Sequence, residues 1–263
     1  MKLTQDQVDE FDRWGLLRLP DAIPHDDATS MGDLVWRQLS TEHGIERDRP
    51  DTWTVERPLG FKPLAQSETF RRTGAAPIAG AADALMGKGS WEPAKHWRPF
   101  VTFAVPGTTW DVPLSGWHYD CPFDRERIDG VPAIHVFAFM APLRPKGGGT
   151  LVLAGSHHLV RKYTAAHPGG GKVHSRTMKD TLGAVHPWLD ELWHKKTEAD
   201  RRRTFLHDGA VVDGIPLRVV ELTGEPGEAY LMNSLLLHAP APNVLPTPRM
   251  MLIQMIGRTE ASG

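Results

Sequence analysis

Short apolar runs separated by proline and glycine fill the chain from residue 98 onward, and this pattern restricts the fold more than any other feature. Clusters such as Gly147-Gly148-Gly149 and Glu225-Pro226-Gly227 stand between the runs and are typical of turns. We predict strands at residues 100–105, 133–141, 150–154, 217–222, 229–232, 235–238 and 250–256. Many short strands with turns between them predict a mainly β fold, either a barrel or a double-sheet jelly roll.

Helices and one short strand are predicted before this β region. Residues 4–14 have the spacing of an amphipathic helix with Thr4 as its N-cap, and residues 16–19 form an apolar run that suits a strand. A second helix is predicted over residues 23–39, and residues 69–86 are predicted to be partly helical. The β core is therefore expected to have flanking helices.

The chain is expected to form one domain over its whole length of 263 residues, because no linker or internal repeat divides it. We assign residues 1–97 to an N-terminal helical or mixed part, and residues 98–160 and 210–258 to the jelly-roll core. Residues 161–209 interrupt the strands, with a predicted helix at 188–203. A long insertion of this kind is often a lid or a binding loop.

Composition and charge exclude several other classes of protein. The formal net charge of -2 gives no basic field for nucleic acid, and no apolar stretch approaches the length of a membrane span. The first residues are polar, unlike a signal peptide, and the single cysteine, Cys121, excludes an intramolecular disulfide framework. We expect a cytoplasmic protein that acts on a small molecule, without nucleic acid or membrane as a partner. The oligomeric state stays open.

Two His-x-Asp pairs occur in the chain, and each could supply two of the three ligands of a 2-His-1-carboxylate iron site. The first pair, His25 and Asp27, falls at the predicted start of a helix, where carboxylates are favoured for a structural reason. The second pair, His118 and Asp120, lies in the strand-rich half. The second pair is therefore the candidate for metal binding.

A third ligand and an anchor for a co-substrate are predicted in the last strands. His238 ends the predicted strand 235–238 and precedes a proline-rich loop, so its side chain can face a cavity, although a core histidine bonded to a backbone carbonyl is an alternative. Arg249 begins the next apolar run, and a guanidinium there requires a carboxylate partner. No acidic residue is close in sequence. The carboxylate partner of Arg249 would therefore be a dicarboxylate co-substrate or a distant Asp or Glu.

The order of His118-Tyr119-Asp120, the segment 147–157, His238 and Arg249 resembles the phytanoyl-CoA dioxygenase family. These enzymes are iron(II)- and 2-oxoglutarate-dependent oxygenases built on a double-stranded β-helix of the cupin-like jelly-roll class. The resemblance covers nearly the whole chain and is weakest at about residues 161–213. It implies that His118, Asp120 and His238 bind Fe(II), that Arg249 holds the distal carboxylate of 2-oxoglutarate, and that O2 is consumed.

Other positions of the family pattern carry over less directly. Some relatives have a hydroxyl residue where this chain has Pro240, and some have a tryptophan where it has Phe137. Thr150 and Thr102 are candidates for the missing hydroxyl contact to the co-substrate, or are ordinary strand threonines. Three aromatic residues flank the predicted ligands and either shape the substrate pocket or pack in the core: Trp110, Trp117 and Tyr119.

The reaction implied by the resemblance is oxidation of a C–H bond, with release of succinate and CO2. Halogenating relatives lack the ligand carboxylate, so Asp120 favours hydroxylation or another oxidation without halide. A small molecule of natural-product metabolism is the expected substrate. Two alternatives remain, a metal-binding cupin-type protein of another reaction type and a catalytically silent binding protein. Basic residues of the insertion, among them Arg161, Arg176 and Arg201-Arg202-Arg203, either recognise an acidic substrate or form a solvated face.

Overall fold

The computed structural model describes residues 2–72, 75–94, 96–120, 130–166, 174–194, 197 and 200–259. Cys121, which follows the predicted ligand Asp120, lies outside the described residues. Within these ranges, no helix combines the length and the apolar character that a membrane crossing requires.

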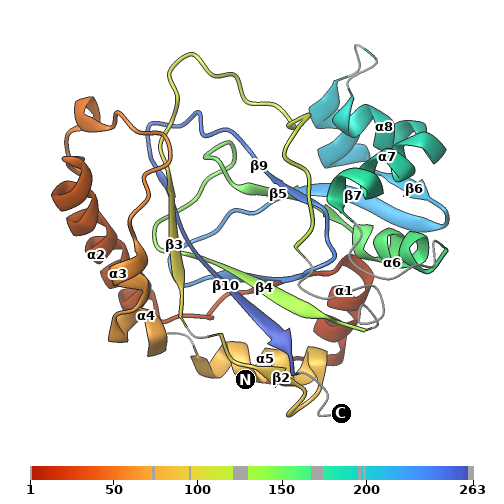
Figure 1. The fold of residues 1–263 in the computed structure, drawn as a ribbon, viewed down its shortest axis with the longest axis horizontal. Coiled ribbons are helices and arrows are strands. Elements are labelled where there is room, and N and C mark those ends of the chain that lie inside the picture. Colours follow the sequence, from red (N-terminus) through yellow and green to blue (C-terminus); the bar gives the residue numbers. More distant parts are fainter. Residues whose placement is uncertain are drawn as a thin grey trace.

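Two antiparallel sheets form a double-stranded β-helix, which confirms the predicted fold class (Figure 1). The larger sheet has the order β1 (Leu16–Leu19), β8 (Ala229–Asn233), β4 (Ala133–Phe139), β10 (Arg249–Arg258) and β2 (Trp91–Glu92), and β3 (Arg98–Thr102) also pairs with β10. The smaller sheet has the order β6 (Ala210–Val212), β7 (Ile215–Glu221), β5 (Thr150–Ala154) and β9 (His238–Pro240). The N-terminal part thus contributes β1 and β2 to the larger sheet.

Side chains that alternate along each strand separate the inside of the β-helix from its helical cover. On β4, Val136 and Ala138 belong to an apolar cluster with the N-terminal helices, whereas Phe137 and Phe139 belong to the cluster between the two sheets. The period of two in a strand requires this alternation. It also fixes which polar residues of the strands face the interior.

Helices cover the outer face of each sheet (Figure 1). The larger sheet packs against α1 (Gln5–Trp14), α2 (His25–His43), α3 (Lys62–Ala65), α4 (Glu68–Arg72) and α5 (Ala75–Met86). The smaller sheet packs against α6 (Ser156–Ala166), α7 (Ser175–Val185), α8 (Pro187–Trp193) and a π-helical segment, Arg203–Asp208. A short 3-10 turn occupies Pro50–Thr52.

The first two helices begin close to their predicted starts, and the second helix extends beyond its predicted end. Thr4 caps α1 in a capping box with Gln7. Asp26 and Asp27 lie in the first turn of α2, and that helix ends beside Gly44, whose φ of 64° closes it four residues beyond the predicted end. The first His-x-Asp pair therefore belongs to a helix start, as expected.

The predicted strand at 235–238 is wrong. Leu235, Leu236 and Leu237 form a buried turn, and His238 begins β9 rather than ending a strand. The side chain of Ser156 accepts a hydrogen bond from the backbone N–H of Leu237 at 2.9 Å. The apolar character of this run reflects burial of a turn between the sheets, which a short run cannot distinguish from a strand.

The insertion also differs from the prediction. It contains α7, which was not predicted, and the helix expected at 188–203 ends at Trp193. The described residues of the insertion pack on the outside of the smaller sheet through Met178, Leu182 and Phe205. A lid function for residues 161–209 stays a prediction.

Candidate metal centre

Backbone hydrogen bonds join the loop that carries His118 and Asp120 to His238, at the start of β9, and to the turn before it. The N–H of His118 donates to the carbonyl of His238 at 2.9 Å, and the N–H of His238 donates to the carbonyl of His118 at 2.8 Å. The N–H of Asp120 donates to the carbonyl of Ser234 at 3.2 Å. The positions of the three side chains are therefore set by backbone pairing rather than by flexible side-chain contacts.

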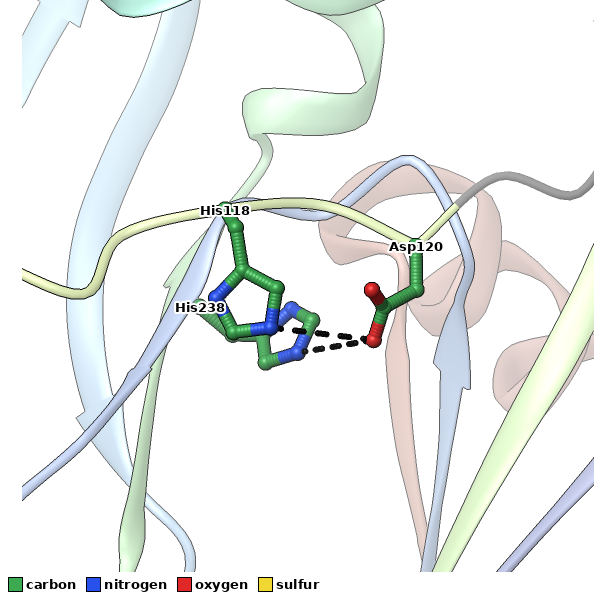
Figure 2. Close-up of side chains that lie close together, drawn as sticks. All are labelled: His118, Asp120 and His238. Atoms are coloured by element: carbon green, nitrogen blue, oxygen red, sulfur yellow. Dashed lines mark ion pairs between the residues drawn. The ribbon is translucent and has the colours of Figure 1, made fainter. Parts of the chain in front are cut away.

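The three predicted ligands converge on one point (Figure 2). Their ligand atoms lie within 4.8 Å of one another. Oδ2 of Asp120 is 3.7 Å from Nε2 of His118 and 3.5 Å from Nε2 of His238. Two imidazoles and one carboxylate on three sides of a point form the donor set of a 2-His-1-carboxylate site.

Both histidines are oriented by their other ring nitrogen. Nδ1 of His118 donates to the carbonyl of Gly116 at 2.7 Å, and Nδ1 of His238 donates to the carbonyl of Leu236 at 3.0 Å. A proton on Nδ1 leaves Nε2 with a lone pair, and each Nε2 faces Asp120. His238 thus makes the backbone contact of a core histidine and also presents a ligand atom.

Asp120 is held in its charged form. The close contact with the ring of His238 lowers the pKa of Asp120 to about 2, although partial burial opposes the shift. An ionised carboxylate is available at neutral pH without the cost of removing a proton.

Arg249 is a buried cation with few partners. Its side chain is 8% exposed, and Nη1 donates to the carbonyl of Gly148 at 2.8 Å. Nε of Arg249 has no hydrogen-bond partner, and no carboxylate of the described chain lies within ion-pair distance of the guanidinium. Burial, and then the charge of Arg57, lowers the pKa of Arg249 to about 10. The distant Asp or Glu that was an alternative partner is not found among the described residues.

One cavity of about 550 Å³ contains both the ligand triad and Arg249 in its wall. Phe137, Thr102 and Thr150 also line it, on the inner faces of β4, β3 and β5. Pro240, which stands where some relatives have a hydroxyl residue, lines it as well. The positions predicted to surround a co-substrate therefore line the same cavity. Their contacts with the co-substrate stay a prediction.

The three aromatic residues considered for substrate binding lie elsewhere. Trp110 and Trp117 are buried in the apolar cluster between the smaller sheet and the insertion, and Tyr119 packs against that cluster. Nε1 of Trp117 donates to the carbonyl of Pro113 at 2.8 Å. None of the three is among the described residues that line the cavity. Their packing agrees with the alternative interpretation, aromatic core packing.

Several cavity residues were missed in the sequence. His135 lies two residues before Phe137 on β4, so strand alternation alone places it on the same inner face. Burial, and then the charge of His238, lowers the pKa of His135 to about 4, so it is neutral, and its Nε2 donates to the carbonyl of Asp120 at 3.3 Å. Arg98 could have been found by the same alternation, because Thr102 shares its face of β3. Residues 57–62, from the N-terminal part, also line the cavity, but no strand alternation in the sequence predicts this.

Comparison with known proteins shows the fold. No protein-family model and no curated protein matches the sequence. Solved structures with this fold include apo EctD from S. alaskensis, with 20% identity, a TM-score of 0.59 and coverage of 97% of this chain and 77% of that chain. SnoN in complex with Fe3+, alpha ketoglutarate and nogalamycin RO has 14% identity, a TM-score of 0.58 and coverage of 96% and 82%. HygX from Streptomyces hygroscopicus with nickel and 2-oxoglutarate bound has 14% identity, a TM-score of 0.54 and coverage of 98% and 88%.

Proposed function

We propose that this protein is an Fe(II)- and 2-oxoglutarate-dependent oxygenase that oxidises a C–H bond of a small molecule. The observation that carries the proposal is the shared cavity, in which the converging triad and a buried arginine that has no carboxylate partner among the described residues both form part of the wall. A metal-binding protein of another reaction type would account for the triad but not for the buried Arg249. We also propose that the protein belongs to the phytanoyl-CoA dioxygenase family.

The residues present fit both the metal and the co-substrate. Nε2 of His118, Nε2 of His238 and the carboxylate of Asp120 would hold Fe(II) and leave positions open for other ligands. The guanidinium of Arg249 would hold the distal carboxylate of 2-oxoglutarate, and the hydroxyls of Thr102 and Thr150, which line the same cavity, would add further contacts. The solved complexes of SnoN and HygX support the proposal, since each contains a metal ion and this keto acid on the same fold.

Iron(II) with 2-oxoglutarate and O2 supplies an oxidant that removes hydrogen from carbon, and succinate and CO2 are released. The chain contributes orientation and exclusion of water. The carbonyls of Gly116 and Leu236 keep the two imidazoles turned toward the centre. Arg249 fixes the far end of the co-substrate, and Phe137 supplies an apolar wall beside His238, with their ring centroids 6.3 Å apart.

Hydroxylation is the reaction that we propose first. In halogenating enzymes of the family that the chain resembles, the ligand carboxylate is missing and a halide can take its place. This chain has the carboxylate of Asp120 at that position. Enzymes of the same fold differ in outcome, because SnoN is described as an epimerase and EctD has been solved with 2-oxoglutarate and 5-hydroxyectoine. The fold alone therefore does not decide which product forms.

Succinate formation tests the proposal, and the first His-x-Asp pair provides a control. The protein loaded with Fe(II) should release succinate from 2-oxoglutarate in the presence of O2, with faster release when a substrate from a small-molecule panel fits. Asp120→Ala should lose bound iron and succinate release to background, because it removes a charged ligand. Asp27→Ala, on the exposed start of α2, should retain both. Full turnover by Asp120→Ala, or a wild-type protein that binds zinc and releases no succinate, would contradict the assignment.

A further inference from the structure

The described wall of the cavity is rich in positive charge. Four of its side chains are cations, and a single carboxylate accompanies them. The cations are Arg57, Lys62, Arg98 and Arg249, and the carboxylate is Asp120, which belongs to the triad. The cavity therefore favours anions by long-range attraction as well as by contact.

The co-substrate accounts for only part of this charge, if the proposed function holds. The two positive charges of Fe(II) and the one of Arg249 equal the two negative charges of 2-oxoglutarate and the one of Asp120. The catalytic centre is then neutral as a unit. Arg57 is paired with Glu56 at 3.2 Å. The positive charges of Arg98 and Lys62 are left without an opposite charge in the described wall.

Arg98 is placed on the inner side of the larger sheet, toward the position that a substrate would occupy. It pairs in register with Ile253 of β10, and Ile253 pairs on its other side with Phe137 of β4. All three side chains line the cavity. The side chain of Arg98 is exposed and takes part in none of the hydrogen bonds or ion pairs found among the described residues. Its guanidinium is free to meet a ligand.

Apolar side chains line the same cavity and are left open to solvent. Leu59 is 78% exposed and Phe100 is 43% exposed, and both are cavity residues. Phe100 lies two residues after Arg98 on β3, so the cation and the aromatic ring share one face of the strand. Exposed apolar side chains beside a cavity are typical of a surface that a ligand covers.

From this juxtaposition we infer that the substrate is a small molecule with an apolar carbon skeleton and an anionic group, a carboxylate or a phosphate, which binds Arg98. The skeleton covers Leu59 and Phe100, and Lys62 adds attraction near the entrance. The inference rests on the proposed function for the location of the substrate. It adds the chemical class of that substrate, which the triad and Arg249 leave undefined.

Matched probes that differ in charge test the inference. The protein loaded with Fe(II) and saturated with 2-oxoglutarate would be titrated under nitrogen with 4-phenylbutyrate, 4-phenylbutyramide and 3-phenylpropyl phosphate, and binding would be measured by calorimetry. At least one anionic probe should bind about tenfold more tightly than the neutral amide, because a guanidinium bonds a charged group more strongly. The stronger of the two anionic probes identifies which group the site prefers.

Variants separate this inference from the proposed function. Arg98→Gln should remove the preference for the anionic probe and retain the affinity for 2-oxoglutarate. Arg71→Gln, an exposed arginine of α4 that does not line the cavity, should keep both. Equal or undetectable binding of all three probes, or a preference that persists in Arg98→Gln, would overturn the inference. Failure of the wild type to bind 2-oxoglutarate would instead contradict the proposed function.

Discussion

Two buried arginines of this protein, Arg201 and Arg249, differ in what surrounds them. Arg201 is 4% exposed and donates to the backbone carbonyls of Glu191, Leu192 and Val112 at 2.6, 2.7 and 3.2 Å. The carboxylates of Asp111 and Glu191 both lie 3.9 Å from its guanidinium. Arg201 therefore ties the insertion to the loop before the triad, using partners that the chain itself provides.

Arg249 is almost as deeply buried but lacks such partners. It makes a single hydrogen bond, to the carbonyl of Gly148, and no ion pair with a described residue. A buried charge is stable only when it is paired and hydrogen-bonded. The difference teaches that burial alone does not identify a functional cation. Nε lacks a hydrogen-bond partner in both arginines, so the difference lies in the nearby carboxylates. A buried cation that has carboxylates of the chain beside it is structural, and one that has none among the described residues and lies beside a cavity indicates a ligand.

The largest effect on stability is expected for Arg201→Met. Its removal leaves three buried carbonyls without their donor and two carboxylates without a nearby cation, so the free energy of unfolding should fall by about 3 kcal/mol. Urea denaturation measures this loss. Arg202→Met is the matched control, because Arg202 is the next residue and its side chain is 51% exposed. Equal, small effects of both substitutions would remove the structural role of Arg201.

Arg249→Met should produce the opposite pattern. The dissociation constant for 2-oxoglutarate should rise about 100-fold, since a charge-assisted contact to a carboxylate is lost. Calorimetry on the metal-loaded variant measures this rise. The melting temperature of the ligand-free protein should stay the same or increase, because a desolvated charge is replaced by an apolar side chain of similar length. An unchanged affinity, or a loss of stability like that of Arg201→Met, would make Arg249 a second structural arginine.

His157 extends the contrast to a titratable residue, with a smaller effect. It is 1% exposed, and its Nε2 donates to the carbonyl of Asp12 at 3.0 Å. Burial, and then the charges of His158 and Arg161, lowers the pKa of His157 to about 3. The unfolded chain takes up a proton there near pH 6.5 and the folded chain does not, so stability falls as the pH drops below that value.

The loss attributable to His157 should be about 2 kcal/mol at pH 5 relative to neutral pH. Urea denaturation of the metal-free protein at the two pH values measures it. His157→Gln keeps a donor for Asp12 without a titrating ring, so this part of the pH dependence should disappear. A variant that loses stability toward pH 5 as steeply as the wild type would show that His157 takes up its proton in the folded state.

Much of the fold and the site could be predicted because the chain repeats simple signals. The strands that carry Phe137, Thr150 and Arg249 are apolar runs bounded by turn residues, and their alternation defines the inner face. The two His-x-Asp pairs could be separated because one falls at a helix start. His238 and Arg249 were found because each places a polar side chain at one end of an apolar run.

The remaining features depend on contacts that sequence spacing does not encode. The run at Leu235–Leu237 is apolar because a turn is buried, so it resembled a strand. In the insertion, the run Arg201-Arg202-Arg203 was interpreted as one unit, whereas only Arg201 turns inward to distant carbonyls. The cavity wall formed by residues 57–62 joins the site through tertiary packing alone.

An anaerobic crystal structure with Fe(II) and 2-oxoglutarate, recorded at the iron absorption edge, tests the central claim most directly. The anomalous peak should lie between Nε2 of His118, Nε2 of His238 and the carboxylate of Asp120. Density for 2-oxoglutarate should extend from that peak to the guanidinium of Arg249. Iron at another position, or a co-substrate that leaves Arg249 without a carboxylate, would contradict the account.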